Sequence, residues 1–414
     1  MTGKIVITGV GASSPLGGTA PESWEALLAG ESGARTMEHD WVAKYNLPVT
    51  FAAEAKVRPD TLLARQTARR LDPSSQFALV SAMEAWHDAG EPDVLPERLG
   101  VDYATGIGGV WTLLDAWDTL RERGPRRVLP MTVPMLMPNA AAATLSMHFQ
   151  ARAFATTVAS ACASSNESLV NAYEHLKAGL ADVVIAGGTE SAIHPITVAS
   201  FASLQALSKR NDDPKTASRP YSVDRDGFVM GEGSASLVLE TEEHALARGA
   251  HIYGELAGGA VTADSYHITA NDPQGRGARR AVLQALEVAG AGPDDVTHIN
   301  AHATSTRVGD PAEYAALREV FGERVHEIPV SATKASTGHL LGGTGALEAV
   351  FTVFALRDRV APPTINITTI DPEIPLSVSA ATQPLGDGPQ LAISDSFGFG
   401  GHNAVIALRD YPQA

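Results

Sequence analysis

Residues 226–240, DGFVMGEGSASLVLE, repeat without a gap in residues 395–409, DSFGFGGHNAVIALR. The two stretches share Asp, Phe, Gly, Ala and Leu at equivalent places, and each predicts a glycine turn that leads into an apolar strand. Because both stretches also close a series of strands and helices, we interpret the match as the trace of a duplication. We place the boundary between the halves near Gly249 to His251, so that the halves are residues 1–250 and 251–414.

The rest of the chain shows the pattern of an α/β protein. Short apolar runs alternate with amphipathic stretches, and many runs are followed by turns rich in glycine or serine. No long linker separates the halves, so we expect them to pack tightly. The expected strands are Lys4–Thr8, Val183–Ala186, Thr297–Asn300 and Ile328–Ser331, and the expected helices are Glu167–Lys177 and the segment carrying Leu347, Val350, Phe351 and Phe354.

Composition excludes several classes of function. With 31 basic and 47 acidic residues the net charge is −16, which opposes general attraction to nucleic acid or to anionic membranes. No apolar run is long enough to cross a membrane, and the N-terminal segment lacks the apolar core of a signal peptide. A single cysteine forbids an intramolecular disulfide and suits a reducing compartment. We therefore expect a globular, cytoplasmic protein.

That single cysteine, Cys162, follows a β-branched run and precedes a helix that we expect from about Ser164 onward. A helix N-terminus favours negative charge and can lower the pKa of a thiol, and small neighbours would let a substrate carbonyl reach the sulfur. The position therefore suits a nucleophile. The competing interpretation, which is the more common one for a lone cysteine, is a buried small hydrophobic residue.

Two histidines stand out because each follows a predicted strand. His302 lies in a loop of small hydroxylated residues, and His339 lies between one such loop and the next helix. Polar loops at the carboxyl ends of strands can converge on one cavity. Taken singly, each of the 13 histidines of the chain is more often a surface or core residue than a catalyst.

Other motifs have structural explanations. Asp310 and Glu313 flank Pro311 as the N-cap and the capping-box acid of a helix would. Asp224-Arg-Asp-Gly lacks the remaining ligands of a calcium loop, so we expect no metal site. The glycine runs lack both the P-loop lysine and the spacing of a dinucleotide fingerprint.

Taken together, five motifs resemble those of the β-ketoacyl-[acyl-carrier-protein] synthases, the elongating condensing enzymes of the thiolase superfamily. The similarity covers essentially the whole chain and is greatest to the synthase II branch of actinobacterial type. The motifs are Ser160-Ala-Cys-Ala-Ser, Asp224-Arg-Asp-Gly-Phe-Val-Met-Gly-Glu-Gly, Asn300-Ala-His-Ala-Thr-Ser-Thr with Gly309-Asp310, Lys334-Ala-Ser-Thr-Gly-His339, and Ser396-Phe-Gly-Phe-Gly-Gly.

The resemblance implies a thiolase fold, with two α/β halves stacked in a five-layered αβαβα arrangement and usually paired as a homodimer. It implies that Cys162 takes an acyl group from an acyl carrier protein. Decarboxylation of malonyl-carrier then yields the carbanion that attacks the acyl-enzyme, with His302 and His339 as hydrogen-bond donors to the malonyl thioester. Lys334 would tune both histidines through Glu348, while the backbone amides of Cys162 and Phe399 would form the oxyanion hole.

Further roles follow from matching positions. Phe399 resembles the gating phenylalanine, Ile107 a residue that lines the acyl pocket, and Thr304 and Thr306 the threonines that bind the phosphopantetheine arm. The enzyme would bind no cofactor of its own, because this arm arrives on the carrier protein. An acidic carrier needs a basic patch, for which the candidates are Arg65, Arg69, Arg70, Lys209 and Arg210.

Two residues depart from the family pattern. Asp395 stands where many members have asparagine, and His402 stands where many have threonine. Neither is one of the expected nucleophile or donor residues, so the departures concern the surroundings of the pocket.

Several rival families fit less well. A thiolase uses a second cysteine, a starter-unit or plant-type polyketide synthase has asparagine in place of His339, and a chain-length-factor subunit typically lacks the cysteine. A papain-like protease shares the separation between Cys162 and His302 but not the signature around its cysteine. An active ketosynthase of a type II polyketide pathway, which would act as a heterodimer, has the same Cys-His-His set and stays open as an alternative.

Overall fold

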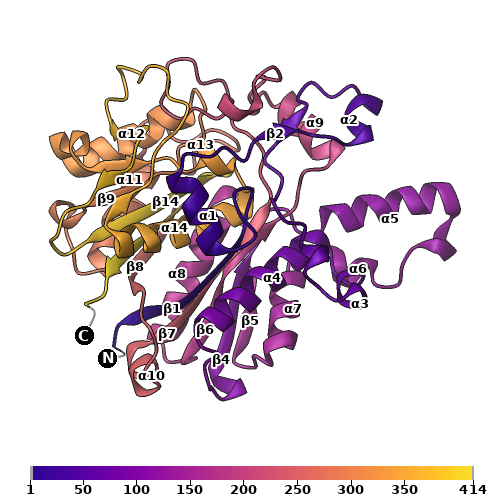
Figure 1. Cartoon of the computed structure of the whole chain (residues 1–414), viewed down its shortest axis with the longest axis horizontal. Coiled ribbons are helices and arrows are strands. Elements are labelled where there is room, and N and C mark those ends of the chain that lie inside the picture. The colour runs from indigo at the N-terminus through magenta and orange to yellow at the C-terminus, as the bar shows by residue number, and fades with distance from the viewer. Residues whose placement is uncertain (1–2, 413–414) are drawn as a thin grey trace.

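A mixed sheet of eleven strands organises the computed structural model, which describes residues 3–412. The order across the sheet is β12-β10-β9-β14-β15-β8-β1-β7-β6-β4-β5. At its middle, β1 and β8 pair only at Val6 with Glu255 and at Ile7 with Gly254. The halves, indigo to magenta and orange to yellow, lie side by side (Figure 1). The sheet is therefore two sheets joined by a short ladder.

Equivalent strands occupy equivalent places in the two halves. In each half the first strand lies beside the fifth, which is followed by the fourth, the second and the third. The fifth strand is antiparallel to both of its neighbours, and the other pairings are parallel. The same topology occurring twice is what a duplication leaves. The strands are β1 (Ile5–Ser13), β4 (Leu99–Ala104), β5 (Phe154–Thr156), β6 (Val183–Glu190) and β7 (Gly233–Thr241), then β8 (Gly254–Ala263), β9 (His298–Asn300), β10 (Pro329–Ser331), β14 (Leu391–Gly398) and β15 (His402–Asp410), with β12 (Ser377–Val378) at one edge.

The repeated sequence that predicted the duplication aligns the two fifth strands. It sets Gly233 against His402, the first residues of β7 and β15, and both strands have the same length. The turns before them differ, however. Asp395 lies inside β14, which makes a hairpin with β15, whereas Asp226 lies in a long excursion between β6 and β7. The two repeats therefore adopt the same structure over the strand, whereas before the strand only their sequences are similar.

Helices complete five layers, as the fold class predicts. Between the two sheets lie α8 and α14, which contact each other and strands of both halves. On the outer face of the N-terminal sheet lie α4 and α7, and on the outer face of the C-terminal sheet lies α11 with α12 beside it. The bounds are α4 (Pro73–Asp88), α7 (Ala140–Phe149), α8 (Ser164–Lys177), α11 (Arg276–Val288), α12 (Gly309–Phe321) and α14 (Thr344–Asp358).

The helix α14 is buried more completely than its sequence pattern predicts. Leu347, Val350, Phe351 and Phe354 predict one apolar face, and all four are buried, but every residue from Thr344 to Leu356 is buried as well. A helix that lies between two sheets has no solvent face, and its alanines allow the close approach. The four expected strands and the two expected helices are all confirmed, with somewhat different bounds.

Smaller elements decorate this core. Two strand pairs lie outside the main sheet: β2 (Arg35–Thr36) with β3 (Phe51–Ala52), and β11 (Val360–Ala361) with β13 (Gln383–Pro384). No helix among residues 3–412 is long and apolar enough to cross a membrane. The remaining helices are α1 (Ala20–Leu28), α2 (Asp40–Lys44), α3 (Arg65–Ala68), α5 (Val110–Arg123), α6 (Thr132–Leu136), α9 (Pro195–Ser203), α10 (Glu242–Ala247) and α13 (Lys334–Thr337).

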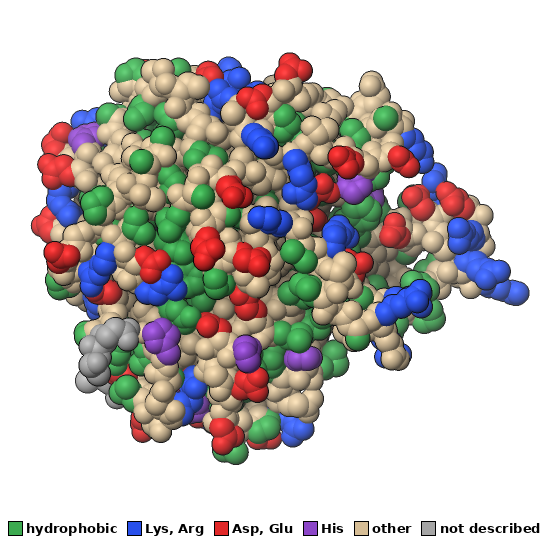
Figure 2. All heavy atoms as spheres, viewed as in Figure 1, with side chains coloured by type: hydrophobic (Ala, Val, Ile, Leu, Met, Phe, Trp, Pro, Cys, Tyr) green, Lys and Arg blue, Asp and Glu red, His purple; other side chains and the backbone are tan. Residues whose placement is uncertain are grey.

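One of these helices, α5, projects from the body of the molecule together with the segment that leads to α6 (Figure 1). Val110 is the only buried residue of α5, and Leu113 and Trp117 are more than half exposed. Basic side chains gather at the outer end of this arm (Figure 2). The arm, residues 110–136, thus contacts the body near its start, through Thr112 to Asp72 and Trp111 to His194, and exposes apolar and basic side chains beyond it.

Candidate active site

Cys162 lies where the third strand of the N-terminal half turns into α8. A short 3₁₀ turn, Ala161–Ala163, separates β5 from the helix, and Ala161 has a left-handed φ of 51°. Such a conformation costs an alanine about 1 kcal/mol. The side chain of Ser164 compensates, because its Oγ accepts the N–H of Ser160 at 2.9 Å and donates to the carbonyl of Ala161 at 2.6 Å. The turn holds the thiol at the helix N-terminus, as expected.

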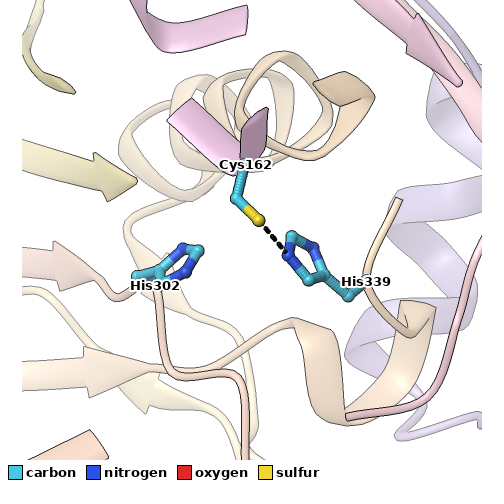
Figure 3. Close-up of side chains that lie close together, drawn as sticks. All are labelled: Cys162, His302 and His339. Atoms are coloured by element: carbon cyan, nitrogen blue, oxygen red, sulfur yellow. Dashed lines mark hydrogen bonds between the residues drawn. The ribbon is translucent and has the colours of Figure 1, made fainter. Parts of the chain in front are cut away.

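The two histidines reach this thiol from the C-terminal half. His302 follows β9, and His339 follows β10 and the short helix α13. Cys162 Sγ and His339 Nε2 are 3.0 Å apart, and the rings of His302 and His339 meet edge to face at 5.6 Å. Figure 3 shows the three side chains pointing toward one another. Residues far apart in the sequence thus form one cluster.

Burial keeps both histidines neutral. It lowers the pKa of His302 and of His339 well below the usual value, and the positive charge of Lys334 lowers both further. His339 Nδ1 lies 3.0 Å from Thr344 Oγ1, and the ring of Phe228 packs edge-on against His339 at 5.3 Å. A neutral imidazole has one N–H donor and one acceptor nitrogen, so each ring can donate a hydrogen bond or accept a proton.

The charge that acts on the histidines is itself held by an ion pair. Lys334 Nζ lies 2.7 and 2.9 Å from the two carboxylate oxygens of Glu348, and Thr333 Oγ1 donates to the same carboxylate at 3.0 Å. Both charged side chains are 1% exposed. A buried pair of this kind is costly to separate, so Lys334 is a fixed charge beside the site.

Burial favours the protonated form of the Cys162 thiol. Burial raises the pKa of Cys162 to about 11, although Lys334 and the backbone N–H groups of Phe399 and Cys162 act in the opposite direction. The expected lowering by the helix N-terminus is therefore wrong in its net sign, because desolvation outweighs it. Cys162 must lose its proton to a base when it reacts, and His339 Nε2 is within reach.

The same two N–H groups lie where an oxyanion hole is expected. The N–H of Phe399 and that of Cys162 both stabilise negative charge at the sulfur. Phe399 follows Gly398, where a Cβ would lie 2.6 Å from the carbonyl of Ser160 and 3.1 Å from the nitrogen of Cys162. Glycine at this position therefore allows β14 to approach the cysteine turn closely enough to place both donors.

A cleft of about 390 Å³ opens over these groups. Its lining includes the three clustered side chains and also the four residues that the resemblance assigns to substrate binding. Part of the Cys162 surface is accessible from the cleft. The structure thus brings together Cys162, His302, His339, Ile107, Thr304, Thr306 and Phe399, which line one cavity.

Asp310 and Glu313 have a different role from the one expected. Helix α12 begins at Gly309 with Val308 as its N-cap, so Asp310 is not a cap and Glu313 is not part of a capping box. Instead both are buried. Glu313 accepts the N–H of His302 at 2.7 Å and that of Ala303 at 2.8 Å, while Asp310 accepts the N–H of Tyr221 at 3.0 Å. Local spacing suggested a cap, but the carboxylates instead accept tertiary hydrogen bonds from the loops of Tyr221 and His302.

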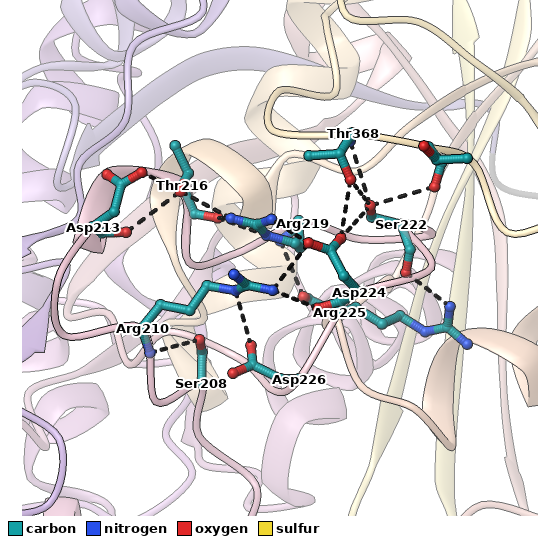
Figure 4. Close-up of polar contacts among 12 residues, drawn as sticks. Ser208, Arg210, Asp213, Thr216, Arg219, Ser222, Asp224, Arg225, Asp226 and Thr368 are labelled. Atoms are coloured by element: carbon teal, nitrogen blue, oxygen red, sulfur yellow. Dashed lines mark hydrogen bonds and ion pairs between the residues drawn. The ribbon is translucent and has the colours of Figure 1, made fainter.

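The rejected calcium motif is a structural cluster (Figure 4). The Asp224 carboxylate lies 2.6 Å from Arg219 and 3.0 Å from Arg210, and it accepts from Ser222 at 2.7 Å. Burial alone would raise the pKa of Asp224, but hydrogen bonds from Ser222, Thr368 and Arg219 lower it to about 2. Its oxygens are occupied by protein donors. Within residues 3–412, the only cluster of three histidine, cysteine or acidic side chains able to hold a metal ion is that of Cys162, His302 and His339.

The basic residues that are expected to bind the carrier differ in their exposure and in their ion pairs. Arg65, Arg69, Arg70 and Lys209 are exposed. Arg210, by contrast, is half-buried and held by Asp224 and Asp226.

The sequence analysis missed two residues. Glu190, at the end of β6, accepts the N–H groups of Gly106, Ile107 and Gly342 at 2.8, 3.2 and 3.1 Å, so it joins loops of both halves. The sequence feature that could have indicated Glu190 is its position as an acid at the end of an apolar strand. Arg307 lines the cleft directly after Thr306 and is exposed, and no carboxylate within the described part of the chain forms an ion pair with it. The sequence feature that could have indicated Arg307 is its position in the same loop as His302.

Comparisons with known proteins agree with this geometry. Residues 2–245 match the family described as Beta-ketoacyl synthase, N-terminal domain, and residues 253–368 match its C-terminal domain. The 3-oxoacyl-[acyl-carrier-protein] synthase 2 of Mycobacterium tuberculosis (strain ATCC 25618 / H37Rv) is 41% identical, with 99% of each chain covered. The protein of the same name from Synechocystis sp. is 42% identical over 99% of this chain and 98% of its own.

Solved structures resemble the chain over its full length. A ketosynthase of a type II polyketide synthase, in complex with its acyl-carrier protein and bound to the hexaketide, has a TM-score of 0.91 and 30% identity, with 100% of both chains covered. A β-ketoacyl synthase from Burkholderia phymatum STM815 has a TM-score of 0.90 and 34% identity at the same coverage. With two matched domains, a Cys-His-His cluster between them and relatives above 40% identity, the chain belongs to the β-ketoacyl synthase family.

Proposed function

We propose that this enzyme condenses acyl-carrier with malonyl-carrier in fatty-acid elongation, with loss of carbon dioxide and through an acyl group on Cys162. One observation carries the proposal. A thiol lies 3.0 Å from a neutral histidine and beside a second one, next to two backbone N–H donors at the floor of a cleft. This arrangement supplies a nucleophile, a base and an oxyanion hole without any cofactor of the enzyme.

In the first half-reaction His339 Nε2 takes the thiol proton as the sulfur attacks the acyl thioester. The N–H groups of Cys162 and Phe399 stabilise the tetrahedral oxyanion, a contribution of about 3–4 kcal/mol per donor in comparable sites. The carbon–sulfur bond to the carrier breaks, and His339 returns the proton to the departing carrier thiol. Burial favours the protonated form of the Cys162 thiol, so this base is needed.

In the second half-reaction malonyl-carrier occupies the cleft. His302 and His339, both neutral, donate hydrogen bonds to its thioester oxygen as carbon dioxide leaves and enolate charge develops. The resulting carbanion attacks the acyl carbonyl on Cys162. The Cys162–carbon bond breaks, the β-ketoacyl product stays on the carrier, and the thiolate takes up one proton.

The carrier delivers both substrates on a phosphopantetheine arm. Thr304 and Thr306 line the cleft, where their hydroxyls lie 3.1 Å apart and can bond the arm. Arg307, which lines the cleft, and the exposed residues Arg65, Arg69, Arg70 and Lys209 suit an acidic carrier. Because Arg210 is engaged by Asp224 and Asp226, we assign it a supporting place in this surface. The outer end of the arm adds the exposed residues Arg121, Arg123, Arg126 and Arg127.

We further propose a homodimer. The arm of residues 110–136 exposes Leu113, Trp117 and Val133, each more than half accessible. The strand β5 is an open edge of the main sheet. Exposed apolar projections and unpaired strand edges are usually covered in the working assembly. A free thiol nucleophile also requires a reducing compartment, which supports a cytoplasmic location.

A type II polyketide pathway is the second candidate. The ketosynthase that shares the fold at a TM-score of 0.91 comes from such a pathway, and it would require a heterodimer here. Identities of 41–42% to fatty-acid-type synthases, against 28–30% to the polyketide ketosynthases, favour fatty-acid elongation.

The test separates the two half-reactions. Purified protein is incubated with a saturated acyl-carrier, and intact mass reports the acyl group on the only cysteine of the chain. Decarboxylation of malonyl-carrier is followed separately. We expect His302→Ala to retain acylation and to lose decarboxylation, whereas His339→Ala loses both because its nitrogen faces the thiol.

Two controls sharpen that experiment. His298 is also buried on β9, and its Nε2 lies 3.1 Å from Ser331 Oγ rather than in the cleft, so His298→Asn should keep both half-reactions. Condensation only with poly-β-keto substrates, or only after a second subunit is added, would move the enzyme to the polyketide class. Undiminished condensation by Cys162→Ala would refute the mechanism.

A further inference from the structure

The main-chain N–H of His302 is held by two acids at once. Glu313 Oε1 accepts it at 2.7 Å and Asp395 Oδ1 accepts it at 3.1 Å, while the other Glu313 oxygen accepts the N–H of Ala303 at 2.8 Å. Asp395 is fully buried and Glu313 is 3% exposed. The backbone of this loop is unusual, because Ala303 and Ser305 both have positive φ. The two carboxyl groups therefore set the position of the His302 ring.

The surroundings contain more acids than cations. Lys334 on α13 faces the pair but is bound to Glu348 on α14, so three carboxyl groups share one ammonium. The phenol of Tyr221 lies 3.4 Å from Glu313. Asp310, also on α12, adds a negative charge next to Glu313, partly balanced by Arg225 at 3.7 Å. Two ionised carboxylates at one buried N–H would be strongly unfavourable here.

The second carboxylate oxygen of Asp395 is in a different situation from the first. Asp395 Oδ2 is buried and has no hydrogen-bond partner. An ionised carboxylate can only accept hydrogen bonds, so an unpartnered buried oxygen costs it about 1–3 kcal/mol or more. A protonated carboxyl has no net charge, so an unpartnered oxygen then costs what a buried neutral group costs rather than what a buried ion costs. The geometry thus favours a proton on the pair.

We propose that Asp395 and Glu313 retain one proton between them and that this shared proton holds the His302 loop in its catalytic position. Asp395 is then a positioning residue for the decarboxylation that the proposed function assigns to His302. The carboxylic acid has nearly the shape and the neutrality of the asparagine that many members of the family carry at this place. Here the neutral form depends on pH.

The direction of the pKa shifts agrees with the geometry. Burial raises the pKa of Asp395 to about 7, with the Lys334 charge acting against it and Glu348 with it. Burial, and then the charge of Asp395, raise the pKa of Glu313 well above its usual value. Below about pH 7 the pair holds its proton; as the pH rises through this value, a second negative charge forms and the carboxylates repel. The step that needs His302 should therefore slow on the alkaline side.

The experiment compares pH profiles of the two half-reactions between about pH 5.5 and 9.5. For the wild type we expect decarboxylation of malonyl-carrier to fall by about tenfold per pH unit above its apparent pKa, while acylation of Cys162 does not fall there. Asp395→Asn should extend the decarboxylation plateau by at least about one unit. Glu232→Gln is the matched control, because Glu232 is also a buried acid with a raised pKa but bonds Ser191, away from the cleft. Its profile should follow the wild type.

A second readout does not need activity. Infrared difference spectra of wild type minus Asp395→Asn should contain the carbonyl band of a protonated carboxylic acid below the apparent pKa, and should lose it above. If Asp395→Asn does not fold, Glu313→Gln serves as the second variant and should abolish the same band. Absence of the band, or an unchanged alkaline limb in the variant, would overturn the shared proton. A wild type that never condenses would instead overturn the proposed function, while the infrared result still decides the proton.

Discussion

After its third strand, each half of the molecule makes the same turn into a buried central helix, although α13 intervenes in the C-terminal half. Ala161 in the N-terminal half and Leu341 in the C-terminal half have left-handed φ values of 51° and 49°. In both halves the next two residues complete a 3₁₀ turn before α8 or α14 begins. The residue after the left-handed position is Cys162 in one half and Gly342 in the other. The duplicated backbone therefore offers two equivalent places, and only one of them carries a thiol.

The reason for the difference is steric. A Cβ on Gly342 would lie 2.1 Å from the nitrogen of Gly106, so the second turn has no room for a side chain. The ionisable residues around the thiol come mainly from the C-terminal half, which supplies both histidines, the Lys334–Glu348 pair and the carboxyl groups behind His302. In the proposed mechanism one half presents the nucleophile, and the other presents the proton acceptor, the histidine hydrogen-bond donors and the charges. Duplication followed by such a division leaves the chemistry in the cleft between the halves.

Removing the one nucleophile is the strongest way to break this comparison. Cys162→Ala should reduce condensation by more than about 10³-fold, because no group of the C-terminal half can replace the thiol. Intact mass after incubation with acyl-carrier should show no added acyl group. An acylated variant would place the covalent step on another residue.

Removing the positive charge of Lys334, in the C-terminal half, should have the next largest effect. Lys334→Met leaves Glu348 buried without its cation, which we expect to lower the unfolding free energy by about 3–5 kcal/mol. Because the Lys334 charge lowers the pKa of both His302 and His339, their pKa values should rise in the variant. Denaturant unfolding measures the first effect and NMR titration of the imidazoles measures the second. Unchanged histidine pKa values would mean that burial alone keeps them neutral.

Titration of the Cys162 thiol shows whether burial, or the helix N-terminus together with the Lys334 charge, dominates the pKa of the thiol. Since burial raises the pKa of Cys162 to about 11, its thiolate fraction grows with pH over the whole range from neutral to about 10. Alkylation of the free enzyme by iodoacetamide should therefore rise about 100-fold between pH 7 and 9. A rate that is already maximal at pH 7 would show that the helix N-terminus and Lys334 outweigh burial.

The smallest effect concerns the position equivalent to the nucleophile. Gly342→Ala forces the loop of Gly106 away from the second turn, at a cost of about 1–3 kcal/mol. Thermal unfolding reports the loss. Gly388→Ala is the matched control, because a Cβ on Gly388 would meet no atom within 4 Å. Equal stability of the two variants would show that the second turn can yield.

Much of this arrangement could be predicted from the sequence. The α/β class, the duplicated halves and the convergence of Cys162, His302 and His339 follow from local patterns and from motifs that resemble the family. Local reasoning failed where tertiary contacts decide the outcome. The spacing of Asp310 and Glu313 predicted a cap, yet their carboxylates bind the loops of Tyr221 and His302. The thiol pKa depended on burial between the halves, which no single stretch of sequence encodes.

The bridging carboxylate of Glu190 has a consequence for engineering. It ties the backbone of Ile107, on the wall of the cleft, to that of Gly342, beside the catalytic turns. Since one buried side chain fastens both, the wall cannot shift to admit a bulkier substrate without disturbing the catalytic floor. Redesign of substrate size should therefore exchange the side chain at position 107 and leave its loop intact.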